Sequence, residues 1–303
     1  MMSIVTTVDN EFLENFHLLY NEKHDNNTLK FYCPYIDANS MSFESLINSL
    51  MEAAGHYCLS RRTWEEYKNK PMRLSRLVRE KFRKLSSNKG ELGELLMFSF
   101  LESALNAPKL LSKMELKTNP NNYFNGADGV HYLKVSDGNY QLIYGESKVY
   151  SDLKNGIKAA ISSIHDFKYE KIKDDESGEL RGIRFEKGLL NAFVTNEAFT
   201  QEDCEFVKSL IYPKASAKYN VDTAFAIFVL FNIDIDQKEK KRSSDDFRKW
   251  LFDILTQQIT KMIPSILKLI EEKELSGHSI YFYLLPMEKL DENREQILKE
   301  VVG

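Results

Sequence analysis

Three residues in the middle of the chain have the types and the spacing needed to cleave a phosphodiester bond. Asp128 begins one predicted strand, and Glu146 and Lys148 lie two residues apart near the end of the next. Residues two apart on a strand point to the same side, so Glu146 and Lys148 share one pocket. Two carboxylates suit Mg²⁺, which polarises a phosphate and activates water, while a lysine can orient that water or offset developing charge.

The Glu-x-Lys triplet is a weak signal by itself, because the chain contains seven other Asp/Glu-x-Lys triplets. Context distinguishes Glu146-Ser-Lys148: it ends an alternating apolar segment, 140–149, and an acidic segment, 128–135, lies across a tight turn. We therefore interpret Asp128, Glu146 and Lys148 together as catalytic, with the two acids as metal ligands. The alternative is a surface hairpin with solvated charged ends, and it is the better reading for Asp128 alone.

The register of this predicted hairpin decides whether the two carboxylates meet. A three-residue loop, 136–138, with Gly138 in the left-handed conformation, places Asp128 directly opposite Glu146. Directly opposed residues project on the same side of a sheet, so the carboxylates then converge. A two-residue loop, Asp137-Gly138, would turn Asp128 to the other face unless a bulge elsewhere restored the register. The site hypothesis therefore predicts the three-residue loop.

A predicted helix at about 90–105 carries two further acids, Glu91 and Glu94, which are neighbours on one face because they lie three apart. Glu94 lies among apolar residues, and we expect it to complete the metal shell or to hold a second metal. For Glu91, a solvated acidic first turn favoured by the helix dipole is almost as good a reading. Gly90 and Gly93 would let this helix approach the sheet closely.

The composition bounds the class of protein. A chain of 303 residues with 43% hydrophobic and 28% charged residues buries one sizeable core in one or two domains. Its longest apolar run, 224–231, is too short to span a bilayer, and we expect no secretion signal. Three separated cysteines argue against a disulfide framework and a structural zinc site. We expect a cytoplasmic protein without membrane contact.

The net charge of −4 conceals a strongly basic segment. Residues 61–89 hold eleven Lys and Arg against three Glu, a local charge of +8 that leaves −12 for the rest of the chain. A predicted helix at about 71–85 separates basic from apolar residues. Its basic stripe would meet nucleic-acid phosphates, an acidic partner surface, or only solvent. The candidate nucleic-acid-binding residues are Arg73, Arg76, Arg79, Arg83 and Lys84.

The remaining pattern predicts an α/β (α+β) fold with a mixed sheet flanked by helices. Further strands are expected at 29–35, 110–117, 224–233 and 280–286, and further helices at 42–57, 152–167, from Thr200, and at 244–273 with a kink at Pro264. A polar stretch near residue 88 predicts a boundary between an N-terminal mixed region, 1–88, and a region at 89–303 that carries the candidate site.

Three sequence runs resemble the HamA family of the Hachiman anti-phage system, within the PD-(D/E)xK, or restriction-endonuclease-like, nuclease superfamily. They are Gly90-Glu-Leu-Gly-Glu94, Gly126-Ala-Asp-Gly129 and Tyr144-Gly-Glu-Ser-Lys148. The resemblance implies a restriction-endonuclease-like nuclease domain at 89–303 and DNA cleavage that depends on Mg²⁺, with Mn²⁺ as an alternative. Ala127 stands where the superfamily name has proline, which leaves the chemistry intact because proline supplies no ligand.

Carried over to this chain, the resemblance implies that Asp128 and Glu146 bind the metal. It also implies that Lys148 positions the attacking water, that Glu94 is the helix acid, and that the partner is a HamB-type helicase. The chain has no G-x-x-x-x-G-K-[ST] phosphate-binding loop, so an ATP-driven step would come from another chain. We hypothesise that the helicase restrains the site until damaged or foreign DNA engages it.

Two other functions stay open. The first is a non-catalytic DNA-binding or scaffold subunit with a decayed nuclease fold, against which the intact acid–acid–lysine set argues. The second is a stand-alone restriction or repair endonuclease, which shares the chemistry and differs only in its partner. Loss of cutting on replacement of Glu146 and Lys148 would exclude the first, and co-purification with a helicase would exclude the second.

Overall fold

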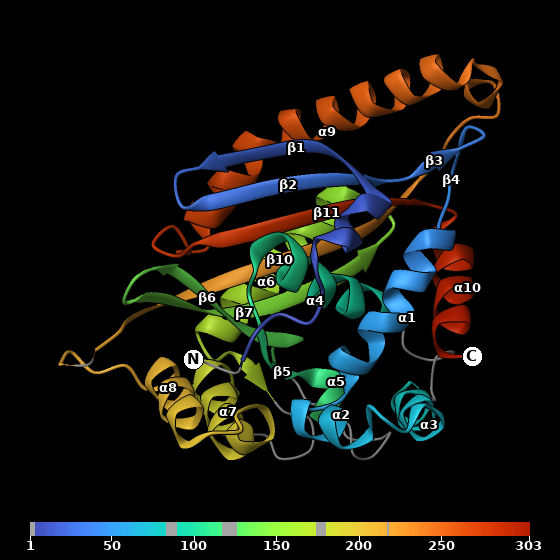
Figure 1. Ribbon diagram of the computed structural model, residues 1–303. Helices are drawn as coiled ribbons and strands as arrows, with labels where there is room; N and C mark the ends of the chain where they lie inside the picture. Colours follow the sequence, from blue (N-terminus) through green and yellow to red (C-terminus); the bar gives the residue numbers. More distant parts are fainter. Residues whose placement is uncertain (1–3, 83–89, 117–125, 174–179, 217) are drawn as a thin grey trace.

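A seven-stranded mixed sheet forms the centre of the computed structural model, which describes residues 4–82, 90–116, 126–173, 180–216 and 218–303 (Figure 1). The strand order is β1-β2-β11-β10-β7-β6-β5. The strands of this sheet are β1 (Phe16–His24), β2 (Asn27–Pro34), β5 (Lys109–Ser112), β6 (Gly129–Ser136), β7 (Asn139–Tyr150), β10 (Asn220–Ile233) and β11 (Ile280–Glu288). Two small pairs complete the strands: β3 (Ile36–Asp37) with β4 (Ser40–Met41), and β8 (Ile172–Lys173) with β9 (Leu180–Arg181).

Helices cover both faces of the sheet. They are α1 (Glu44–Cys58), α2 (Arg61–Tyr67), α3 (Pro71–Lys81), α4 (Glu91–Leu105), α5 (Lys113–Leu116), α6 (Leu153–Lys168), α7 (Ile183–Glu197), α8 (Gln201–Ile211), α9 (Ser244–Glu272) and α10 (Leu290–Val302), with 3₁₀ turns at Asn10–Asn15 and Glu239–Lys241. The predicted mixed sheet flanked by helices is confirmed. Within the described ranges, none of these helices combines the length and the apolar character needed to pass through a lipid bilayer.

Strand β10 is the buried spine of the sheet, because it pairs in parallel with both β7 and β11. Its residues 224–231 are buried on both faces, which explains their unbroken apolar run. Phe225 and Ile227 face a core formed with α6, α7, α8 and α9, whereas Phe228 and Leu230 face a core formed with α1, α4 and α10. The sheet therefore separates two hydrophobic cores.

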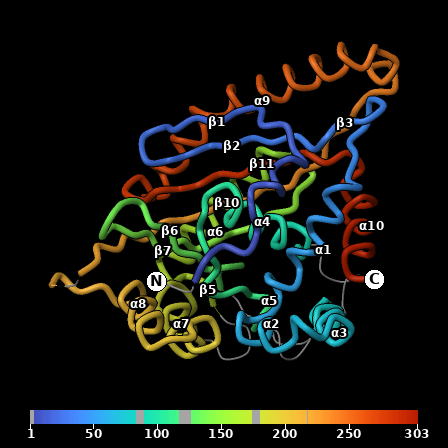
Figure 2. Tube along the Cα trace, in the orientation of Figure 1, coloured from blue at the N-terminus to red at the C-terminus, as the bar shows by residue number. Residues whose placement is uncertain are grey.

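The two ends of the chain meet in this sheet. Strand β2 pairs in parallel with β11, and the tube in Figure 2 shows the two running side by side in blue and red. The predicted boundary near residue 88 falls at 83–89, outside the described residues, but the strands before it belong to the same sheet as those after it. The sequence did not indicate β1, an edge strand whose residues are half-buried or exposed without strict alternation.

Several predicted elements begin where their capping residues stand. Asp152 opens α6 by accepting the N–H of Asn155, and Thr200 opens α8 by accepting the N–H of Asp203. The strand predicted at 110–117 is present but too long, because β5 ends at Ser112 and α5 follows at once. The hydroxyl of Ser112 accepts the N–H of Glu115 at 3.1 Å, which turns the chain into that short helix.

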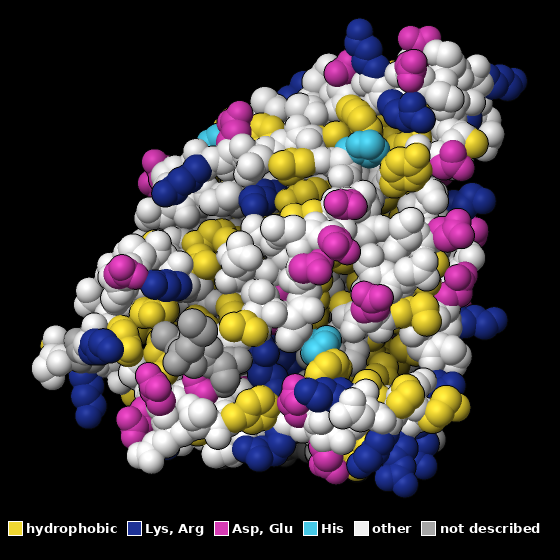
Figure 3. All heavy atoms as spheres, viewed as in Figure 1, with side chains coloured by type: hydrophobic (Ala, Val, Ile, Leu, Met, Phe, Trp, Pro, Cys, Tyr) yellow, Lys and Arg dark blue, Asp and Glu magenta, His cyan; other side chains and the backbone are white. Residues whose placement is uncertain are grey.

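The amphipathic character of α3 is confirmed for the described residues. Leu74, Leu77 and Val78 pack against the core formed with α1, α4 and α10. The basic face of α3, which we define as Arg73, Arg76 and Arg79, is exposed to solvent. Figure 3 shows Lys and Arg side chains gathered at the lower edge of the molecule, where Figure 1 places α2 and α3. The candidates Arg83 and Lys84 lie outside the described residues.

The β6–β7 hairpin has the predicted register but not the predicted loop. Gly129 pairs with Gly145 and Lys134 with Tyr140, as the three-residue loop required. The turn itself is shorter, because Ser136 pairs with Asn139 and only two residues connect the strands. A register shift beside Val135 takes up the extra residue and restores the alignment farther along. Gly138 has φ 76°, the left-handed conformation that the sequence indicated.

Gly93 lets α4 lie against β7, as its position predicted. A Cβ at this residue would lie 2.5 Å from Ser147 Oγ and 3.0 Å from Val149 Cγ2. Both atoms are on the strand that carries Glu146 and Lys148. The helix backbone at Gly93 therefore packs directly against side chains of that strand.

We predict that Gly93→Ala lowers the free energy of unfolding by about 1–3 kcal/mol, because the new methyl group forces α4 away from β7. Gly188→Ala is the matched control, since Gly188 lies inside α7 with no atom within 4 Å of an added Cβ. It should be neutral or stabilise the protein by up to about 1 kcal/mol through helix propensity. Equal losses for the two variants in chemical denaturation would contradict the close approach.

Candidate active site

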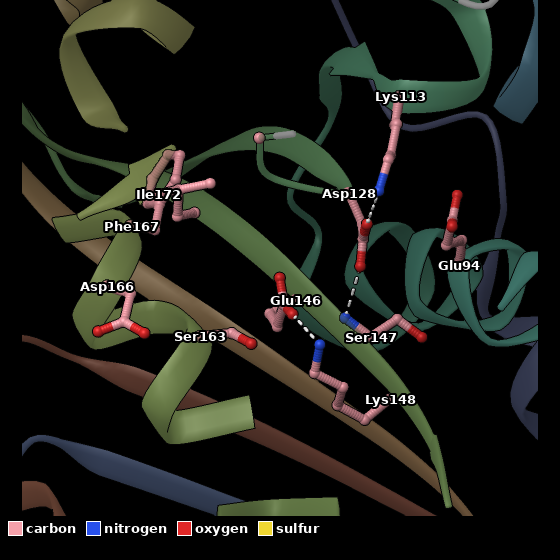
Figure 4. A pocket seen from close by; sticks show the side chains of 11 residues that line it. Glu94, Lys113, Asp128, Glu146, Ser147, Lys148, Ser163, Asp166, Phe167 and Ile172 are labelled. Carbon is pink, nitrogen blue, oxygen red and sulfur yellow. Dashed lines mark hydrogen bonds and ion pairs between the residues drawn. The ribbon is translucent and has the colours of Figure 1, made fainter. Parts of the chain in front are cut away.

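A cavity of about 320 Å³ lies beside the β6–β7 hairpin and is lined by residues of the hairpin and of the helices around it (Figure 4). It is lined by Glu94, Lys113, Gly126, Asp128, Glu146, Ser147, Lys148, Ser163, Asp166, Phe167 and Ile172. The four residues that the sequence analysis nominated as catalytic all line it. They come from α4, from β7 and from the segment that leads into β6, which are far apart in sequence.

Asp128 is fixed from three directions. Its backbone N–H donates to the carbonyl of Gly145 at 2.9 Å, which extends the hairpin register by one residue and sets Asp128 beside Glu146. Its Oδ2 accepts the backbone N–H of Ser147 at 2.9 Å, and its Oδ1 accepts from Lys113 Nζ at 3.1 Å. With 6% of its surface exposed, this carboxylate has little freedom to move.

Glu146 is the second acid of the cavity, and its surroundings disfavour its charge. Burial and then the negative charge of Asp128 raise the pKa of Glu146 to about 7, although Lys148 and Lys113 oppose the shift. Lys148 Nζ lies 2.5 Å from Glu146 Oε1, as expected for residues two apart on one strand. At neutral pH this carboxyl is therefore close to the midpoint of its titration.

Lys148 stays protonated. Burial alone would lower its pKa, but the charge and hydrogen bond of Glu146 together with the charge of Asp128 more than offset this, so the pKa of Lys148 is raised. A lysine in this state donates hydrogen bonds and stabilises negative charge, and it does not accept a proton. The side chain is 26% exposed, so it reaches the cavity.

Glu94 lines the cavity on the other side of Asp128 from Glu146 in Figure 4. It is buried, and its Oε2 accepts the hydroxyl of Tyr57 at 2.8 Å. Among the residues that the structure describes, no three acids, histidines or cysteines form one metal-binding group, so Glu94 does not join the other two acids in such a cluster. Its part in metal binding stays a prediction. Glu91 is 2% exposed, so the reading of it as part of a solvated first turn is wrong.

Two residues that contact the site were not found from the sequence. Lys113 follows β5, in the segment mistaken for a continuous strand, and the Asp128 carboxylate raises the pKa of its ammonium group. Glu186 lies on α7, which the sequence analysis did not predict, and is 3% exposed. It accepts the N–H of Ala127, and burial raises its pKa to about 7.

Glu186 shapes the segment that leads into Asp128. A Cβ at Gly126 would lie 2.4 Å from Glu186 Oε2, so any side chain there would displace the Glu186 carboxylate. The glycine in the sequence Gly126-Ala-Asp was therefore the one available signal of a close neighbour, but it did not show which residue that neighbour is.

The side chains of the cavity fit a divalent cation. Mg²⁺ takes one or two carboxylates and completes its shell with water and substrate phosphate, and Asp128 and Glu146 supply two. The mutual repulsion that helps to raise the pKa of Glu146 is the kind that a cation between the acids removes. Mg²⁺ binding by these residues stays a prediction.

One family model matches the chain over almost its whole length. The model of the HamA family matches residues 8–301 of the 303-residue chain. The chain belongs to the HamA family. This membership gives the chain a role in Hachiman anti-phage defence. No curated protein matches it.

We predict that Glu146→Gln in this HamA-family protein raises the free energy of unfolding relative to the native protein at about pH 8 by roughly 1–3 kcal/mol, but little at about pH 4. The carboxyl titrates near 4.5 when unfolded and near 7 when folded, so its contribution to stability is lost as pH rises through that window. Denaturant titrations in chelator at both pH values measure the difference. Asp137→Asn, at an exposed carboxyl whose pKa is lowered by Lys134, is the control and should show no such gain. A gain for Glu146→Gln that is independent of pH would contradict the raised pKa.

Proposed function

We propose that this HamA-family chain is a metal-dependent DNA nuclease of an anti-phage defence system. One observation carries the proposal: Asp128, Glu146 and Lys148 line a single cavity of about 320 Å³ and present two carboxylates and a protonated amine to it. A divalent cation held by the two acids would polarise a phosphate and lower the pKa of a water molecule. The family match supports the defence role and is silent on the reaction.

Each residue of the set has a distinct part in phosphodiester hydrolysis. Asp128 is an acceptor held rigidly by the Ser147 N–H and by the hairpin, so it provides an oriented ligand. Glu146 provides the second ligand; its pKa is about 7 without metal, and a bound cation would favour its ionised form. Lys148 orients the attacking water or stabilises the charge that develops on the phosphate.

A partner completes the proposal. A HamB-type helicase would supply ATP-driven movement on DNA, for which this chain has no phosphate-binding loop. We infer that the helicase also restrains the nuclease, because an unregulated one would damage the host genome. Cleavage by the isolated chain should therefore be faster than cleavage by the complex, and no more cleavage by the isolated chain would contradict the restraint.

The proposal predicts that plasmid and linear DNA are cut in Mg²⁺ or Mn²⁺ and left intact in chelator. Glu146→Ala and Lys148→Ala should each lower the rate by at least about 100-fold, since each removes a group that acts on the reacting phosphate. Glu66→Ala is the matched control, because it alters another Glu-x-Lys triplet, exposed on α2. Gel assays of the chain with and without its helicase measure the rates. Cutting that persists in Glu146→Ala or in chelator would exclude this site as the source.

We also propose that the basic face of α3 binds DNA phosphates. Arg73, Arg76 and Arg79 are exposed on a helix whose other side is anchored in the core. The ion pair of Arg76 with Glu80, at 3.6 Å, is a surface contact between exposed side chains, so it leaves the arginine available. Helix α3 precedes α4, which carries Glu94 into the cavity, with only residues 82–90 between them.

The double variant Arg73→Glu/Arg76→Glu should weaken DNA binding at least about tenfold at low salt. It should also reduce the slope of log affinity against log salt by about 2, because each lost phosphate contact contributes about 0.9. Lys249→Glu/Lys261→Glu makes the same charge change on exposed positions of α9, which lies at the opposite end of the molecule (Figure 1). Fluorescence anisotropy measures both. Equal losses in the two variants would indicate a general charge effect and no specific role for α3.

A further inference from the structure

Lys113 lies at the wall of the cavity opposite Lys148. In Figure 4 the two ammonium groups point inward from opposite sides, with the carboxylate of Asp128 between them and that of Glu146 beside Lys148. The cavity is lined by four acids, Glu94, Asp128, Glu146 and Asp166, and by two lysines, each of which is paired with one of the two proposed metal ligands. The sequence motif accounts for only one of these lysines.

The backbone of Lys113 is anchored independently of its side chain. Its N–H donates to the carbonyl of Asp128 at 3.1 Å, and the preceding Ser112 pairs with Gly129 across the β5–β6 ladder. The hydroxyl of Ser112 also donates to the carbonyl of Tyr57 at 2.6 Å. The position of the Cα is therefore fixed, while the four-carbon stem leaves the ammonium group free to change its partner.

The ammonium group of Lys113 has spare hydrogen-bonding capacity. Among the residues described, Asp128 Oδ1 is the one acceptor within hydrogen-bond distance of Nζ, which leaves two N–H donors for a ligand. The side chain is 21% exposed, so it is open to the cavity.

Lys109, four residues earlier, is a structural lysine by comparison. Its Nζ donates to the carbonyl of Leu59 at 2.8 Å and pairs with Glu115 at 3.2 Å, and its side chain is 2% exposed. Lys109 does not line the cavity. The difference between these two lysines indicates that the Lys113 ammonium group is available to a ligand bound in the cavity.

We propose that Lys113 is a second cationic residue of the site, which occupies Asp128 in the absence of metal and contacts the substrate phosphate once a divalent cation binds that acid. The proposal rests on the proposed nuclease function. It specifies that the substrate phosphodiester is contacted by Lys113 on one side and by Lys148 on the other. Before metal binds, Lys113 neutralises a carboxylate that would otherwise be buried without a counter-charge. Afterwards, repulsion from the metal and attraction to a phosphate both draw the ammonium group away from Asp128.

The test compares metal binding with cutting in Lys113→Met, which keeps the length of the side chain and removes its charge. Binding of Mn²⁺ alone, followed by electron paramagnetic resonance or calorimetry, should become at least about threefold tighter, because a competing cation has been removed. The rate of DNA cutting at saturating metal should fall at least about tenfold, because one phosphate contact is lost. Lys113→Arg keeps the charge and should recover part of the rate.

Lys134→Met is the matched control, since Lys134 forms an exposed ion pair with Asp137 on the same hairpin and should change neither measurement. Weaker Mn²⁺ binding in Lys113→Met would mean that Lys113 only orients Asp128, and it would overturn the proposal. Unchanged cutting at saturating metal would overturn it as well. A native protein that binds Mn²⁺ without cutting DNA would instead refute the nuclease function. The comparison of Mn²⁺ binding by the native protein and Lys113→Met would still test whether Lys113 competes with the cation for Asp128.

Discussion

The hydrogen bond from the backbone N–H of Ser147 to Asp128 Oδ2 joins the two halves of the cavity. Ser147 stands between Glu146 and Lys148, so the strand that carries these two residues also fixes the acid that faces them. The bond from the N–H of Asp128 to the carbonyl of Gly145 adds a second constraint on the same pair of segments. These contacts keep the carboxylates of Asp128 and Glu146 close enough to share one ligand. The energetic cost of their repulsion is offset by the surrounding structure.

Charge balance decides how the cavity behaves before a ligand arrives. Lys148 and Lys113 both lower the pKa of Glu146, yet it is still raised to about 7, because burial is the largest influence and the charge of Asp128 adds to it. A site of this kind is less stable than an apolar one of equal size, as is common where function requires buried charge. The glycines of the site have a similar cost, because Gly93 and Gly126 contribute no side-chain packing. Gly93 allows α4 to lie close to β7, and Gly126 allows Glu186 to lie close to the segment before Asp128.

The sequence predicted those parts of the site that depend on local pattern. Alternation and a turn glycine located the hairpin, and the spacing of Glu146 and Lys148 located one wall of the cavity. The loop length was wrong because a bulge at Val135 and a shorter turn give the same register as a longer loop, and the sequence does not distinguish the two. Lys113 and Glu186 reach the site through tertiary packing of α5 and α7, and no periodic pattern encodes such contacts. The burial of Glu91 was missed for the same reason, since helix position alone does not show what covers a side chain.

The parallel pairing of β10 with β7 sets the order in which the molecule can be assembled. It aligns Asn220 with Asn139 at one end and Phe231 with Tyr150 at the other, across a sequence separation of 81 residues for the first pair. During synthesis, β7 therefore has β6 as its only available neighbour in the final sheet until β10 has left the ribosome. Long-range pairing of this kind slows folding, because the loop must close before the contacts form. A nascent chain consequently forms the β7–β10 pairing that supports Asp128 and Glu146 only after most of its length has been translated. A truncated product that ends before β10 lacks this support.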